Sequence, residues 1–94
     1  MTAADAISLA ANDNVATALR PIAAGESVAV ACNGAQFRIR VVDDVPLCHK
    51  VALATLAPGQ TVFKYGQPIG VATAPIDVGA HVHVHNIRSN RVTS

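Results

Sequence analysis

Three segments of the chain share one pattern, in which a branched aliphatic residue, two further residues, a glycine and two more residues lead to a valine. The copies are IAAGESV (22–28), LAPGQTV (56–62) and IDVGAHV (76–82). Glycine accepts the positive φ that a tight reversal requires, and the valine re-enters an extended segment. In the middle copy, Pro58–Gly59 fits the central pair of a type II turn. Because the spacing between copies is irregular, we interpret them as reuse of one turn and not as a solenoid.

The segments between these turns are typical of short strands. SVAVAC (27–32) and QFRIRVV (36–42) flank Asn33–Gly34, a pair that suits a tight hairpin turn. In the second segment, apolar residues alternate with two arginines, which predicts a half-buried strand with one solvated face. Further extended segments are expected at 49–56, 61–66, 69–73 and 80–88.

The opening third of the chain leaves two interpretations open. ADAISLAAN (4–12) is rich in alanine and fits a helix, whereas NVATALRPI (14–22) fits a helical turn or a strand. No long periodic helix occurs anywhere, so we predict a mostly β fold, a small domain of short twisted strands with many glycine turns. The 94 residues correspond to one domain, 1–94, in which residues 1–6 are predicted to form a flexible tail.

Composition and charge exclude several classes of function. The chain is 51% hydrophobic and 14% charged, so its surface carries apolar area that a partner would bury. The net charge is +1 and the seven basic residues are scattered, which argues against nucleic-acid binding. No stretch approaches the roughly 18 apolar residues of a membrane span.

Two further features indicate the compartment. The N-terminus carries an acidic residue where a signal peptide has basic ones, so we expect no export. Cys32 and Cys48 lack a CxxC spacing, which is typical of reduced thiols. A cytoplasmic location is therefore expected.

Three of the four histidines, His81, His83 and His85, alternate within HVHVHN (81–86). In a strand they would share one face, with consecutive Cα atoms roughly 6.6 Å apart. Two imidazoles at that spacing can converge on one metal ion, and imidazole suits Fe, Zn, Ni or Cu. The nearest acid in sequence is Asp77, so no third ligand is evident. Three interpretations stay open: a solvated face, a metal or substrate contact shared with another chain, and a self-contained metal site.

Other polar residues have both structural and functional interpretations. Asn86 fits a turn cap or a ligand contact, and Lys64 fits a solvated lysine ahead of a glycine turn. His49 and Lys50 are adjacent, so on a strand their side chains would point to opposite faces. The chain contains no GxSxG, P-loop or dinucleotide fingerprint. These residues alone support no named function.

Taken together, three segments resemble a known family. DNVATALRPIAAGESV (13–28), PLCHKVALATLAPGQTVFKYGQPIGVAT (46–73) and VGAHVHVHNIRSN (78–90) resemble the small N-terminal domain of altronate and galactarate dehydratases, a SAF domain with a β-clip fold. The order of His49–Lys50, KYGQPIG and VHVHN carries the resemblance. Two positions depart from the family pattern. Cys48 stands where the family usually has Gly, and Val84 stands where the hexarate dehydratases generally have Thr.

The resemblance implies that this domain is the small subunit of a sugar-acid dehydratase, a carbon–oxygen lyase, and caps the active site of a separate large catalytic subunit. The end of the chain shortly after the motif fits such a subunit, and equally a piece cut from a longer enzyme. One alternative is the alpha subunit of a sulfolactate sulfo-lyase, a carbon–sulfur lyase. Another is a non-catalytic SAF binding module. An isolated small subunit is also expected to self-associate, and it is not expected to be active alone.

The resemblance also implies roles for particular residues. His49, Lys50, His83 and His85 are expected in catalysis, and Lys64 and Asn86 in binding the substrate. The substrate would be a small acid: a hexonate, a hexarate or sulfolactate. The complete enzyme is expected to use a divalent metal, most often iron, which His83, His85 and His81 would bind together with the partner chain.

Overall fold

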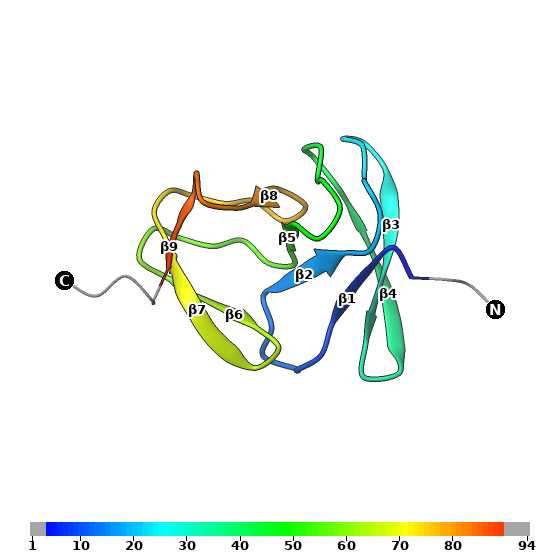
Figure 1. Cartoon of the computed structure of the whole chain (residues 1–94), viewed down its shortest axis with the longest axis horizontal. Helices are drawn as coiled ribbons and strands as arrows, with labels where there is room; N and C mark the ends of the chain where they lie inside the picture. Colours follow the sequence, from blue (N-terminus) through cyan, green and yellow to red (C-terminus); the bar gives the residue numbers. More distant parts are fainter. Residues whose placement is uncertain (1–3, 90–94) are drawn as a thin grey trace.

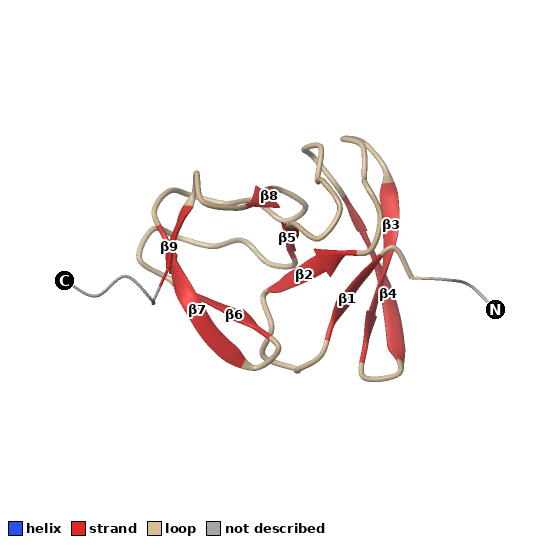
Figure 2. Cartoon of the chain, viewed as in Figure 1, coloured by secondary structure: helices blue, strands red, loops and turns tan. Residues whose placement is uncertain are grey.

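The structure, a computed structural model, describes residues 4–89 of the chain. These residues form strands, turns and loops without a helix (Figure 2), which confirms the mostly β prediction. The nine strands of this range are β1 (Ala6–Ser8), β2 (Val15–Ala18), β3 (Ser27–Cys32), β4 (Ala35–Arg40), β5 (Lys50–Ala52), β6 (Thr61–Lys64), β7 (Gln67–Ala72), β8 (His81–Val82) and β9 (Ile87–Ser89).

The strands form two sheets. The larger sheet has the order β4-β3-β1-β2-β5-β8, and the smaller has the order β6-β7-β9. The β1–β3 pair is parallel and the other pairs are antiparallel. Figure 1 shows the β3–β4 hairpin at one end of the molecule and the smaller sheet at the other, with β2 and β5 between them.

The core is divided into two clusters of buried side chains. β2 and β5 contribute to both, because alternate residues of a strand face opposite sides. Ala16 and Val51 lie in the first cluster, and their neighbours Val15 and Ala52 lie in the second. The remaining buried members are, in the first, Ala6, Ala18, Ile22, Val28, Val30, Val41 and Val45 and, in the second, Leu56, Val62, Ala72, Ile76 and Val82.

The glycine-turn motif occurs a fourth time, in a copy that the sequence pattern did not reveal. Val45–Val51 has the same form, with Cys48 in place of the glycine. Cys48 has a φ of 70°, and the glycines of the other copies have φ values of 92°, 86° and 85°. In every copy a backbone N–H closes the turn by donating to the carbonyl three residues earlier: Glu26 to Ala23, His49 to Pro46, Gln60 to Ala57 and Ala80 to Asp77.

The four turns divide the fold into two halves with the same hydrogen-bond pattern. The first aliphatic residues of the turns pair in bridges, Ile22 with Val45 and Leu56 with Ile76. The backbone pairs that flank the turns also correspond. In the first turn the backbones of Gly25 and Glu26 hydrogen bond with Val41, and in the third turn those of Gly59 and Gln60 do the same with Ala72. In the second turn the backbones of Cys48 and His49 hydrogen bond with Ala18, and in the fourth turn those of Gly79 and Ala80 do the same with Ala52.

The structure decides the ambiguous opening third and corrects one strand. Residues 6–8 and 15–18 are strands, since pairing with neighbouring strands outweighs the helix propensity of alanine. Segment 36–42 was expected to be half-buried, and this is wrong for β4, an edge strand. Phe37 is 40% exposed, Ile39 only packs against the first cluster, and full burial begins at Val41, beyond the strand.

The flexible tail predicted for residues 1–6 lies only partly within the residues that the structure describes. Residues 1–3 of the predicted tail lie outside the described range. The Asp5 carboxylate accepts from the Ala29 N–H and from the Arg20 guanidinium, and Ala6 begins β1. Among residues 4–89 no helix has the length and apolar character that a membrane crossing requires.

Candidate functional site

The pairing of β5 with β8 brings the histidines together. His49 ends the second turn and precedes β5, and His81 follows the fourth turn and begins β8. In the register of this pair, Lys50 faces Val82 and Val51 faces His81. The two histidine-bearing segments, 32 positions apart in the sequence, therefore lie side by side.

The imidazole rings of His49, His81 and His83 are stacked. The His49 and His83 ring centroids are 4.0 Å apart, and those of His49 and His81 are 5.1 Å apart. Nδ1 of His49 and Nε2 of His81 are hydrogen bonded at 2.8 Å. The His85 ring is tilted against His81, with centroids 5.1 Å apart, and it is exposed. We call His49, His81 and His83 the histidine cluster.

The expected strand over 80–88 is wrong at residues 83–86, which form a turn between β8 and β9. The Asn86 side chain holds this turn. Its Oδ1 accepts from the His83 N–H at 3.0 Å, and its Nδ2 donates to the His81 carbonyl at 2.9 Å. Val84 is 81% exposed and not buried with Val82. The side chain of Asn86 thus has the turn-capping role, and its contact with substrate stays a prediction.

Burial and like charge lower the pKa of two cluster members. Burial is the larger cause of the lowered pKa of His81, followed by the neighbouring histidines His85, His49 and His83. The pKa of His83 is also lowered, first by burial and then by His49 and Lys50. Both side chains therefore favour the neutral imidazole near pH 7, the form that binds a metal or accepts a proton.

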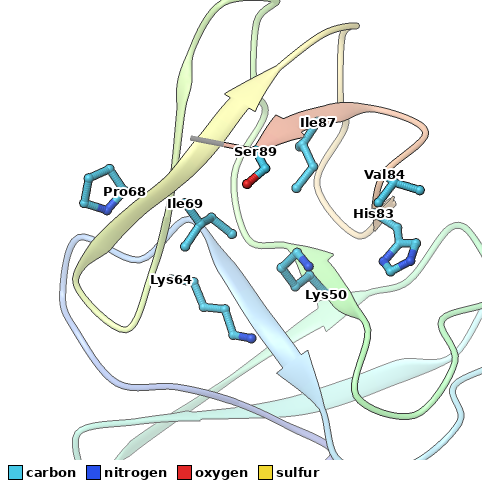
Figure 3. Close-up of a pocket in the computed structure, with 8 residues that line it drawn as sticks. All are labelled: Lys50, Lys64, Pro68, Ile69, His83, Val84, Ile87 and Ser89. Carbon is cyan, nitrogen blue, oxygen red and sulfur yellow. The ribbon is translucent and has the colours of Figure 1, made fainter. Parts of the chain in front are cut away.

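A pocket of about 610 Å³, which we call the lysine pocket after Lys50 and Lys64 in its lining, adjoins the histidine cluster at His83. Figure 3 shows Lys50 and Lys64 on one side of this pocket, with Ile69 and Ile87 nearby. Pro68, Val84 and Ser89 complete its lining. The pKa of Lys50 is lowered, mainly by burial and then by repulsion from Lys64. Two amines that repel each other across an open pocket favour an anion between them, such as a carboxylate.

Lys64 is oriented by its neighbour in the β6–β7 turn. Its Nζ lies 5.1 Å from the Tyr65 ring centroid, within reach of a cation–π contact. The Tyr65 hydroxyl in turn lies 3.1 Å from Thr17 Oγ1 on β2. These contacts hold the side chain of Lys64, which lines the pocket and is not only the solvated lysine that the sequence allowed.

The residues present fit a divalent metal. The three residues of the histidine cluster each offer one ring nitrogen, and these nitrogens lie within 4.8 Å of one another. Nδ1 of His83 is buried and has no hydrogen-bond partner among the described residues. Imidazole is a ligand that iron, zinc and other divalent first-row metals accept. A bound ion here would supply a Lewis acid beside the lysine pocket.

The structure brings most of the predicted site residues into one place. His49, Lys50, Lys64, His81 and His83 surround the pocket or the cluster, whereas His85 lies at the exposed rim. Sequence reasoning missed the backbone support of the cluster. It also missed Ile69, Ile87 and Ser89, which line the pocket. No local pattern marks these residues, because β7–β9 pairing places them there.

Known proteins resemble this chain over most of its length. The altronate dehydratase of Escherichia coli (strain K12) is 46% identical over 84 residues, 89% of this chain and 16% of the relative. That of Bacillus subtilis (strain 168) is 41% identical over 78 residues, 83% of the chain and 15% of the relative. The (2R)-sulfolactate sulfo-lyase subunit alpha of Paracoccus pantotrophus is 42% identical over 62 residues, 66% of the chain and 92% of the relative.

These relationships define a family and leave the whole enzyme open. The chain spans only 16% and 15% of the two altronate dehydratases, so their complete activities belong to proteins several times longer. Residues 4–90 match the family described as the altronate/galactarate dehydratase SAF domain. With that match and identities above 40% to two altronate dehydratases, the chain belongs to the SAF domain family of altronate and galactarate dehydratases.

Proposed function

We propose that the chain is the small subunit of a sugar-acid dehydratase and caps the active site of a separate large catalytic subunit in the cytoplasm. The observation that carries this proposal is the contact between the histidine cluster and the lysine pocket at His83. None of the described residues that line the pocket is a carboxylate. A cationic, open and incomplete site of this kind is suited to close over groups from a second chain.

The proposed reaction is the loss of water from a hydroxy acid. A base removes the proton α to the carboxylate, the β-hydroxyl group leaves, and negative charge develops on the carboxylate oxygens. Lys50 and Lys64 bind that carboxylate and stabilise the charge in the enediolate-like transition state. His49 and His83 supply metal ligands or move a proton to the leaving hydroxyl, His85 acts in proton transfer alone, and Asn86 contacts the substrate or holds the turn.

A second candidate is the alpha subunit of a sulfolactate sulfo-lyase. The Paracoccus pantotrophus subunit favours it, because the aligned part of this chain covers 92% of that relative. The same lysine pocket would hold the substrate carboxylate, and sulfite would leave in place of hydroxide. Assays with a hexonate, a hexarate and sulfolactate on one preparation distinguish the two lyases.

The first test is co-purification of the tagged chain from its own cells, with identification of bound proteins by mass spectrometry. A large lyase subunit in stoichiometric amount is expected. A chain that emerges without a partner and binds a sugar acid tightly in calorimetry would instead support a non-catalytic binding module.

The second test uses the reconstituted complex. Replacing His83 and His85 together by Ala should abolish turnover while the melting temperature of the domain stays within a few degrees. Arg38→Ala on the exposed strand β4 is the matched control and should keep full activity. Full turnover by the double variant would contradict the proposal.

A further inference from the structure

We propose that His49, His81 and His83 form a divalent-metal site that is complete in its protein ligands within this chain. The inference deepens the proposed function, on which it rests for the metal's purpose, and it replaces the expected set of alternate histidines from one strand. The new member is His49, which the β5–β8 register carries to the cluster from a different turn.

Distances within the cluster suit a shared ion. Two imidazole nitrogens bound to one ion at about 2.1 Å are roughly 3.0–3.4 Å apart. Nδ1 of His49 and Nε2 of His81 are already 2.8 Å apart, and all three ligand nitrogens lie within 4.8 Å. The remaining approach is about 1–2 Å, which a change in ring torsions can supply.

His83 provides an independent argument for a ligand. Its Nδ1 is buried and has no hydrogen-bond partner among residues 4–89. A buried polar atom without a partner loses the hydrogen bond that it makes with water in the unfolded chain, so native structures rarely keep one without a purpose. A metal bound by the cluster would offset this loss.

The backbone around the cluster is fixed before any ion binds. The His81 N–H donates to Asp43 Oδ2 at 3.0 Å, and the His49 N–H closes its turn on the Pro46 carbonyl. Asn86 holds both the His81 carbonyl and the His83 N–H. Metal sites depend on such support, which sets the orientation of the ligands.

The site would leave coordination positions open for substrate. Three histidine ligands are typical of catalytic centres in which a water or substrate oxygen completes the shell. His83 lines the same pocket as Lys50 and Lys64 (Figure 3). An anionic oxygen held by the two lysines would therefore lie on the side of the histidine cluster where His83 faces the pocket. The ligand class that fits is a carboxylate, and a hydroxy carboxylate offers two oxygens.

The test titrates the 94-residue chain, free of any affinity tag and stripped of metal with a chelator, with Co²⁺ alone. We expect one Co²⁺ per chain, with visible ligand-field absorption typical of nitrogen coordination. The variants His49→Ala, His81→Ala and His83→Ala should each weaken binding at least tenfold. His85→Ala, which removes a neighbouring imidazole outside the cluster, should leave the affinity within about twofold of the unmodified chain, since His85 supplies no ligand.

Circular dichroism of each variant, and a second substitution, His49→Gln, separate lost ligation from lost folding. Folded variants at position 49 with undiminished Co²⁺ affinity would overturn the proposal, as would loss of binding in His85→Ala alone. Weak binding of several ions, equal in all variants, would also overturn it. None of these results depends on the partner, so the metal site and the split-enzyme proposal can fail separately.

Discussion

Cys48 adopts the backbone conformation that glycine adopts in the other three turns. Its φ of 70° is in the left-handed region, where a Cβ atom costs roughly 1–2 kcal/mol. The side chain is exposed, so it gains little packing in return. Cysteine in place of glycine therefore leaves the turn unchanged and places a strained residue directly before His49.

Cys48→Gly is expected to stabilise the domain. Relief of the positive φ outweighs the greater freedom of glycine in the unfolded chain, for a net gain of about 0.5–1 kcal/mol. Thermal melting should then shift upward by a few degrees for a domain of this size. Cys48→Ala is the matched control, because it removes the thiol but keeps the Cβ atom. An equal gain in both variants would assign the effect to the thiol and not to the backbone.

Asn86→Ala is expected to loosen the turn at residues 83–86. It removes the two side-chain hydrogen bonds to His81 and His83, each worth about 0.5–1.5 kcal/mol. We expect a loss of about 1–2 kcal/mol of stability in chemical denaturation, and a Co²⁺ affinity lowered by about tenfold. Asn86→Asp keeps an acceptor for the His83 N–H but has no donor for the His81 carbonyl. Its stability and its Co²⁺ affinity should therefore lie between those of the unmodified chain and those of Asn86→Ala. Unchanged Co²⁺ affinity in Asn86→Ala would show that the turn does not position the ligands.

Among the elements, the turns were the most predictable part of the fold. Three copies follow from glycine and its flanking aliphatic residues, because the positive φ is a local requirement. The Asn33–Gly34 hairpin turn is confirmed as well, with φ values of 50° and 81°. The fourth turn was hidden because Cys48 tolerates a conformation that its residue type rarely adopts.

Pairings between distant segments were not predictable from one sequence. The histidine cluster depends on β5 lying next to β8, and the pocket depends on β7 pairing with β9. The alternation in HVHVHN favoured a continuous strand, but the Asn86 side chain accepts from the His83 N–H and donates to the His81 carbonyl, and these bonds turn the chain after Val82. The residue types of the site were therefore recognisable, whereas their geometry and the participation of His49 required the tertiary structure.

The β1–β2 loop and the β6–β7 turn are joined through Asp13. Its carboxylate accepts from the N–H groups of Leu9, Ala10 and Gly66. Burial acts to raise the pKa of Asp13, but these bonds outweigh it and the pKa is lowered from the ordinary value of 3.8. A lowered pKa in the folded state means that the stabilisation is present above about pH 4 and is lost as the pH falls through the folded pKa.

Asp13→Ala should therefore flatten the acid side of the stability profile. The unmodified chain is expected to lose stability steeply below about pH 4, and the variant, already less stable at pH 7, should lose less over the same interval. Melting temperatures measured from pH 7 to pH 2 test this. Asp77→Ala is a suitable control, because Asp77 is an exposed carboxylate in the fourth glycine turn, away from the β1–β2 loop. Parallel profiles for Asp13→Ala and the unmodified chain would rule out this role for Asp13.

At the scale of the whole molecule, two halves of similar design are joined into one unit. Each half contributes two turns and one core cluster, but β2 and β5 pass between the clusters and place alternate residues in each. Neither half can lose its core without exposing the other half's strands. We therefore expect the domain to unfold in one cooperative transition, as most single domains of this size do.

Matched substitutions in the two clusters test this cooperativity. Val30→Ala removes buried groups from the first cluster and Val62→Ala from the second, and each should cost about 2 kcal/mol. If the halves are coupled, both variants shift the same single transition, and the calorimetric and van't Hoff enthalpies agree. Two separated transitions, with each variant moving only one, would mean that the halves fold independently. The histidine cluster joins His49, which ends a turn of the first half, to His81, which follows a turn of the second half. If the halves fold independently, the cluster would be stable only while both halves are folded.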